Sequence, residues 1–275
     1  MEKIPTLILS KDRAPQLRLL IESLYANATG IFEPYVLWKA TTQEHQNGYY
    51  KLQSEKLGVN WSRETYMLEN LYGFLQMFQG QHFALFMDDC IFYKPLRKTP
   101  EELLSLFDDD TWCLSLRLGE NTTESTKKPL KPVYKKDGFI KYNFKEHEAY
   151  DNYGFYFSWD GVVYNTDEVL KMFNNDDFYG TDNQYAILPQ KIENFMSNKR
   201  DECEKDIICC PTESHVVSMN YNSTHPNASF NDFPLDELLK VYLEQHMTID
   251  FDTIDFNNIN GTHDNRSFAL RPIML

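Results

Sequence analysis

Hydrophobic positions in the first 120 residues alternate between short unbroken runs and runs with helical spacing. Residues 4–9 (IPTLIL) form an unbroken apolar run, which predicts a buried strand. Leu17, Leu20, Ile21 and Leu24 then recur at the i, i+3, i+4, i+7 spacing of one helix face. The same reasoning predicts strands at 34–40, 58–61, 82–87 and 111–118, with helical segments at 49–57 and 67–78.

Polar residues before several of these segments predict where helices begin. Ser62 can cap the helix whose apolar face runs from 67 to 78, and Thr166 can cap a short helix over 167–173. A fuller signal stands at 99–102 (TPEE), where Thr99 is placed at N-cap, Pro100 at N1 and Glu102 at N3.

The alternation of strands and helices predicts an α/β fold with a mostly parallel central sheet and helices on both faces. The second half is less regular. It contains a predicted hairpin at 133–142 with an Asp137-Gly138 turn, strands at 206–211 and 215–219, and a helix at 233–245. There is no internal repeat and no Gly/Ser linker, so we expect one domain over 1–275, with a nucleotide-binding half (1–120) and an acceptor-binding half (121–275).

Composition narrows the possible partners. A net charge of −14 over 275 residues argues against binding to nucleic acid, and an anionic ligand would need a cation between it and the protein. Aromatic residues make up 15% of the chain, which suits either sugar stacking or core filling. The five cysteines argue against a disulfide framework, and neither a signal peptide nor a membrane span is evident. We therefore expect a cytoplasmic protein, with peripheral attachment to a membrane left open.

Two groups of charged residues follow predicted strands, where parallel sheets bind ligands. Asp88-Asp89 is either a pair of solvated carboxylates or a site for Mg²⁺ or Mn²⁺, which prefer carboxylate oxygen and often bridge to phosphates. The stretch 10–13 (SKDR) is either a helix cap with surface charge or a contact for a nucleotide. No GxGxxG or GxxxxGK[ST] motif is present, so dinucleotide-binding and P-loop chemistry lose support.

Two further acidic residues could act on a substrate hydroxyl. Asp160 interrupts an aromatic stretch at 153–166, where a carboxylate needs a partner or a cavity. Asp182 lies in a glycine-containing loop (YGTDNQ), where it could serve as a general base. A turn or cap role is open for both. The histidines show no HExxH spacing, but His225 and His263 lie in polar stretches where either could complete a metal shell.

Several of these stretches resemble GT-A-type glycosyltransferases, in particular the large family 2-like group. The segment LILSKDRAPQLRLLIESL resembles the first strand, loop and helix of that fold, and LFMDDCIFYKPL resembles its DxD-like strand end. SLRLGENTT (115–123), FSWDGVVYNTDEVL (157–170) and THDNRSFAL (262–270) look like a less characterised branch of sugar transferases. The motifs are scattered over most of the chain.

The resemblance implies roles for individual residues. Contacts to the nucleotide sugar would come from Ser10, Asp12, Arg13, Asp88 and Arg117. The metal, Mn²⁺ or Mg²⁺, would be held by Asp89 and His263, although Cys90 stands where a DxD motif has its second Asp. The catalytic base would be Asp182, which falls in Thr181-Asp182 rather than the usual Glu-Asp, or Asp160, which would stand near the acceptor sugar.

The predicted function is therefore transfer of a hexosyl or pentosyl group from a UDP- or GDP-sugar to a glycan or glycoconjugate hydroxyl, dependent on a divalent metal and inverting. Three alternatives remain at this point. A sugar nucleotidyltransferase would usually open with a glycine-rich phosphate loop, which is absent. A carbohydrate-binding protein without catalysis would have no use for a metal at Asp88-Asp89. A glycoside hydrolase would need two facing carboxylates and no nucleotide.

Overall fold

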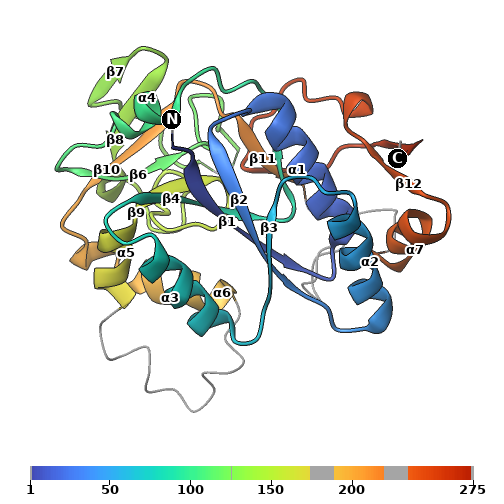
Figure 1. Ribbon diagram of the computed structural model, residues 1–275. Coiled ribbons are helices and arrows are strands. Elements are labelled where there is room, and N and C mark those ends of the chain that lie inside the picture. The colour runs from blue at the N-terminus through green and yellow to red at the C-terminus, as the bar shows by residue number, and fades with distance from the viewer. Residues whose placement is uncertain (1, 125, 174–188, 220–234, 274–275) are drawn as a thin grey trace.

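A nine-stranded sheet with helices on both faces forms the centre of the molecule (Figure 1). The computed structural model describes residues 2–124, 126–173, 189–219 and 235–273. The strand order is β3-β2-β1-β4-β9-β6-β10-β8-β7. In that order the bounds are Asn60–Arg63, Phe32–Lys39, Ile4–Lys11, His82–Met87, Val162–Asn165, Thr111–Ser115, Ile207–Pro211, Phe139–Asn143 and Tyr134–Lys136.

Four of the eight neighbouring strand pairs are parallel, so the predicted parallel sheet forms with antiparallel parts. Strands β3, β2, β1 and β4 pair in parallel, and so do β6 and β10. Strand β9 is inserted between β4 and β6 and is antiparallel to both, and β8 is antiparallel to β10 and β7. Because β9 runs against its neighbours, its first residue lies at the edge where β1, β4 and β6 end.

Alternate residues of β1 point into two separate cores, as expected for a central strand buried on both faces. Leu7 and Leu9 belong to a cluster shared with α3 (Met67–Met77), α5 (Thr166–Phe173) and α6 (Pro189–Asn198). Ile4 and Ile8 belong to the opposite cluster, which includes α1 (Ala14–Asn27) and α2 (Gln43–Ser54). None of the helices within the described residues has the length and apolar character that crossing a membrane needs.

Two small sheets attach the C-terminal segments to this frame. Strands β5 (Cys90–Phe92), β11 (Val216–Met219) and β13 (His263–Asp264) form one, in the order β13-β11-β5. Strands β12 (Met247–Asp250) and β14 (Ala269–Pro272) form the other, beside α7 (Leu235–Glu244). The first of these sheets matters for the site, because β5 begins directly after Asp88-Asp89.

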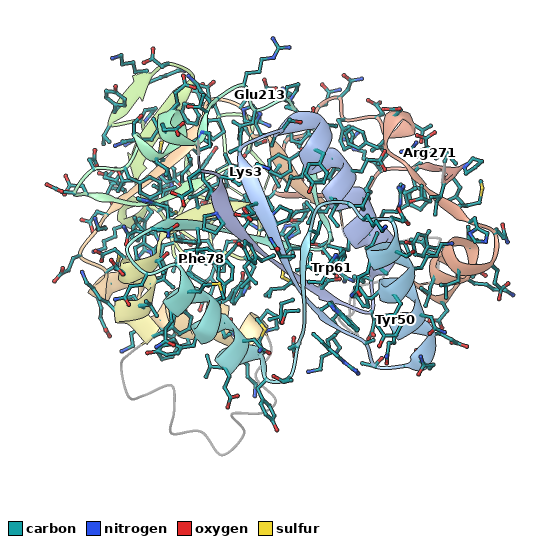
Figure 2. All side chains as sticks on the ribbon, in the orientation of Figure 1. Lys3, Tyr50, Trp61, Phe78, Glu213 and Arg271 are labelled. Atoms are coloured by element: carbon teal, nitrogen blue, oxygen red, sulfur yellow. The ribbon has the colours of Figure 1, made fainter. Side chains whose placement is uncertain are left out.

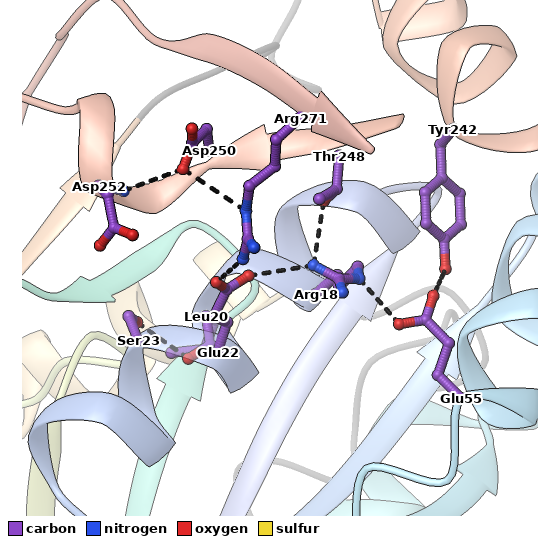
Figure 3. Close-up of polar contacts among 10 residues, drawn as sticks. All are labelled: Arg18, Leu20, Glu22, Ser23, Glu55, Tyr242, Thr248, Asp250, Asp252 and Arg271. Atoms are coloured by element: carbon purple, nitrogen blue, oxygen red, sulfur yellow. Dashed lines mark hydrogen bonds and ion pairs between the residues drawn. The ribbon is translucent and has the colours of Figure 1, made fainter. Parts of the chain in front are cut away.

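A row of alternating charges joins the C-terminal segments to the first two helices (Figure 3). This charge ladder consists of Glu55, Arg18, Glu22, Arg271 and Asp250. Arg18 donates to Glu55 at 2.8 Å and to Glu22 at 3.0 Å, and Arg271 pairs with Glu22 and, at 3.5 Å, with Asp250. Figure 2 shows Arg271 on the same side of the molecule as the helix that carries Tyr50. The ladder thus ties β12 and β14 to α1 and α2.

The predicted elements are largely confirmed, with errors at helix starts. Thr99 caps α4 (Pro100–Leu104) through a complete capping box, and the hairpin forms around Asp137-Gly138 as β7 and β8. The cap at Ser62 is wrong, because Ser62 pairs within β3 and α3 begins only at Met67. The cap at Thr166 is wrong by one position, since the side chain of Asn165 accepts the free N–H groups at the start of α5.

Candidate functional site

Four neighbouring strands meet at one edge of the sheet and gather most of the predicted site residues. Strands β1 and β4 pair in parallel from Thr6↔Ala84 to Leu9↔Met87, so 10–13 and 88–89 emerge side by side. Arg117 follows β6 by two residues, and Asp160 precedes β9 by two. Because β9 runs antiparallel between β4 and β6, Asp160 enters the same edge from the opposite direction.

Asp88 is buried and fully engaged by groups of β1 and the loop after it. Its Oδ2 accepts from Ser10 Oγ at 2.8 Å and from Lys11 N at 3.2 Å, and its Oδ1 accepts from Arg13 Nη1 at 3.0 Å. Tyr49 O–H lies 2.6 Å from Ser10 Oγ, which extends the network into α2. Asp88 therefore orients Arg13, and its predicted contact with a nucleotide stays a prediction.

Arg13 links the two adjacent carboxylates. Its Nη1 also donates to Asp89 Oδ2 at 3.1 Å, and its buried Nε has no hydrogen-bond partner among the described residues. Burial opposes the positive charge, but Asp88 and Asp89 outweigh it and raise the pKa of Arg13. The guanidinium is thus a fixed positive charge at the base of the site.

Asp89 and Asp160 come together from different strands. One oxygen of each, with Cys90 Sγ, forms a group of ligand atoms within 4.8 Å of one another; we call Asp89, Cys90 and Asp160 the acid cluster. Desolvation, together with the charges of Asp160 and Asp88, raises the pKa of Asp89 to about 7 despite the opposing effect of Arg13. Asp160 Oδ2 accepts from Arg117 Nη1 at 2.7 Å. Each carboxylate thus has an arginine on one side and faces the other carboxylate.

His263 reaches the acid cluster through the small sheet. Strand β11 pairs with β13 at Ser218↔His263 and with β5 at Ser218↔Cys90, so one residue bridges the two. His263 Nε2 lies 3.8 Å from Asp160 Oδ2, and 48% of its side chain is exposed. The imidazole therefore borders the carboxylates on the side open to solvent.

The donor atoms of this group fit a hard divalent cation. Mn²⁺ and Mg²⁺ prefer carboxylate oxygen, and Mn²⁺ also accepts imidazole nitrogen. Asp89 and Asp160 therefore suit either ion, and His263 suits Mn²⁺. Cys90 suits it less, because burial first and the nearby carboxylates second raise the pKa of its thiol, which remains protonated. The raised pKa of Asp89 also indicates that a further positive charge would be favourable here.

Asp12 has a different environment from the other predicted site residues. Its backbone adopts φ +61°, and its carboxylate accepts from Thr41 N at 2.7 Å and from Thr41 Oγ1 at 2.8 Å. His45 Nδ1 lies 3.7 Å away. Asp12 thus fastens the loop after β1 to the loop after β2, and its nucleotide contact stays a prediction. Asp182 and His225 lie outside the described residues.

One acidic residue of the site was missed by sequence reasoning. Glu193 of α6 accepts from Trp159 N at 3.4 Å, beside Asp160. Desolvation, followed by the negative charge of Asp160, raises the pKa of Glu193 to about 8. The local sequence QKIENF shows only an apolar helix face, with Ile192 and Met196 buried, so no motif marks this carboxylate.

Comparisons with known proteins add little. No protein-family model matches the chain, and no curated protein matches it. Among solved structures, S. aureus TarS is similar over 79% of this chain and 36% of its own, with a TM-score of 0.48 and 14% sequence identity. The chain thus spans little more than a third of that protein's length. A likeness at this level shows neither a shared detailed fold nor a shared activity.

Proposed function

We propose that this chain is a glycosyltransferase that moves a sugar from a nucleotide-sugar donor to a hydroxyl acceptor. The observation that carries the proposal is the acid cluster, flanked by the buried Arg13 and Arg117, at the edge where four strands meet. Ligands of open α/β sheets bind at the carboxyl ends of strands. Paired carboxylates with adjacent arginines at that edge suit a divalent ion and a diphosphate.

The donor diphosphate would lie over this edge of the sheet. Asp89, Asp160 and His263 would hold Mn²⁺ or Mg²⁺, which supplies positive charge to the departing diphosphate. Arg13 and Arg117 add fixed positive charge beside it, and Asp88 keeps Arg13 in place. These charges stabilise the nucleoside diphosphate as a leaving group.

The acceptor hydroxyl would attack the anomeric carbon from the side opposite the diphosphate. A single base on the acceptor side is then sufficient, and the product has the inverted configuration. Uridine or guanosine diphosphate sugars are the proposed donors, and a glycan or glycoconjugate is the proposed acceptor.

The test begins with binding. The chain is titrated with UDP and GDP by calorimetry, with and without Mn²⁺, and nucleotide-sugar hydrolysis is then measured. We expect a nucleoside diphosphate to bind at least about 10-fold more tightly with Mn²⁺ present, because the ion neutralises charge between two anionic groups.

Asp89→Asn and Asp160→Asn should remove most of that metal effect, and Asp137→Asn is the matched control. Asp137 lies at the exposed turn between β7 and β8, where an asparagine tolerates its positive φ. Binding of a free glycan with no response to nucleotide or Mn²⁺ would instead indicate a carbohydrate-binding protein. Formation of a nucleotide sugar from a sugar phosphate and a nucleoside triphosphate would indicate a nucleotidyltransferase.

A further inference from the structure

We propose that Glu193 is the catalytic base that takes the proton from the acceptor hydroxyl, an assignment that rests on the proposed glycosyl transfer. It is the acidic residue of α6 beside the acid cluster, and it comes from a separate element of the second half of the chain.

Two hydrogen bonds fix α6 against the residue that precedes Asp160. Trp159 N donates to Glu193 Oε1 at 3.4 Å, and the indole Nε1 of Trp159 donates to Pro189 O at 3.0 Å. Trp159 is 2% exposed, so the surrounding core holds its indole in place. The carboxylate of Glu193 is therefore held at a set position next to Asp160, with Oε2 free of any hydrogen bond found among the described residues.

Asp160 is less suited to the same role. Arg117 Nη1 donates to its Oδ2 at 2.7 Å, and Cys90 Sγ lies 3.9 Å from its Oδ1. Both oxygens thus have partners, and the arginine compensates the negative charge. A carboxylate whose two oxygens are both engaged is better placed to bind a cation or orient a sugar than to receive the proton of an acceptor hydroxyl.

Glu193 has the opposite environment. Within the described part of the chain no lysine or arginine forms an ion pair with it; the charged groups that act on it are Asp160 and, more weakly, Arg117. Its packing neighbours include the buried Trp159. One carboxylate oxygen of Glu193 is engaged by Trp159 N, and within the described residues the other has no partner, so it offers the free acceptor atom that a base acting on a hydroxyl needs.

The proposed step balances as follows. The acceptor oxygen forms a bond to the anomeric carbon while the bond from that carbon to the diphosphate oxygen breaks. The bonding electrons leave with the nucleoside diphosphate, and the hydroxyl proton passes to Glu193. The proton is released to water after the products leave, so no further reactant is needed.

The test uses the full chain with the donor and acceptor identified by the assays above. Glu193→Gln keeps the shape of the side chain and removes the base, and Glu202→Gln, at an exposed position beyond the end of α6, is the matched control. We expect Glu193→Gln to lower kcat for transfer about 100-fold or more, with the nucleotide Kd in Mn²⁺ within about 3-fold of the original. Retained nucleotide binding also shows that the variant is folded.

Chemical rescue gives an independent measurement. In Glu193→Ala, added formate should restore part of the transfer rate, because a small carboxylate can occupy the space left by the side chain. Transfer by Glu193→Gln within about 5-fold of the original would overturn the assignment. So would equal losses of nucleotide affinity and of kcat, or no response of Glu193→Ala to formate. If the unmodified chain neither binds a nucleoside diphosphate nor transfers a sugar, the proposed function itself fails.

Discussion

Replacing Arg18 by methionine tests whether the charge ladder holds the C-terminal segments in place. Methionine keeps most of the aliphatic stem, so the change removes charge and hydrogen bonds more than packing. Arg18 donates to Glu55 at 2.8 Å, to Glu22 at 3.0 Å and to Thr248 at 3.3 Å, and its side chain is only 12% exposed. The substitution therefore leaves the carboxylate of Glu55, whose side chain is 9% exposed, without its arginine partner.

The expected loss follows from that burial. Removing one partner of a buried ion pair costs about 3–5 kcal/mol because the other charge is left without compensation. Glu55 keeps a hydrogen bond from Tyr242 O–H at 2.7 Å, and Glu22 keeps Arg271, so both retain some support. We expect Arg18→Met to lower the free energy of unfolding by about 2–4 kcal/mol.

Urea unfolding followed by circular dichroism measures this loss, and a double-mutant cycle assigns it. Glu55→Gln in the Arg18→Met background should cost at least about 1 kcal/mol less than it does alone, since the uncompensated charge is gone. Lys171→Met is the control, because Lys171 pairs with Glu168 at 3.0 Å on an exposed surface and should matter by no more than about 0.5 kcal/mol. A loss below 1 kcal/mol for Arg18→Met, or additive effects in the cycle, would refute the reasoning.

Two further predictions concern the site. Without a bound metal, the stability that Glu193 contributes should fall as pH rises from about 4.5 to about 8, because the folded chain holds a proton on Glu193 in that range and the unfolded chain does not. Glu193→Gln should flatten this fall in a melting-temperature series across the pH range, and an unchanged slope would count against the raised pKa. Gly161→Ala should lower the free energy of unfolding by about 1–2 kcal/mol, because Gly161 has φ +69° and an added Cβ would lie 3.0 Å from Val216. Urea unfolding measures this loss, and a neutral effect would contradict the expected strain.

Much of the frame could be predicted because its signals are local. The apolar run of β1 and the 3.6-residue spacing of α1 both lie within short windows, and the capping box at Thr99 is complete in four residues. The predicted cap at Ser62 was wrong because Ser62 lies in the four-residue strand β3, which pairs with β2. This tertiary contact overrides the local preference of serine for a helix cap.

The site was predictable residue by residue but not in its connections. Arg13, Asp88 and Asp89 could be predicted as site residues because each follows an apolar run that predicts a strand. The approach of Asp160 depends on an antiparallel strand inserted between β4 and β6, and that of Glu193 on the packing of α6 against Trp159. Both are long-range pairings that leave no mark on the neighbouring sequence.

The antiparallel course of β9 has a consequence for how such a protein can vary. Before β9 begins, the chain passes along one face of the sheet. The rings of Tyr153, Tyr156, Phe157 and Trp159 pack in the core on that face. The position of Asp160 at the edge of the sheet therefore depends on how these four rings pack. Exchanging one of these rings for a larger or smaller one would therefore shift Asp160 relative to Asp89, although no residue of the acid cluster is replaced.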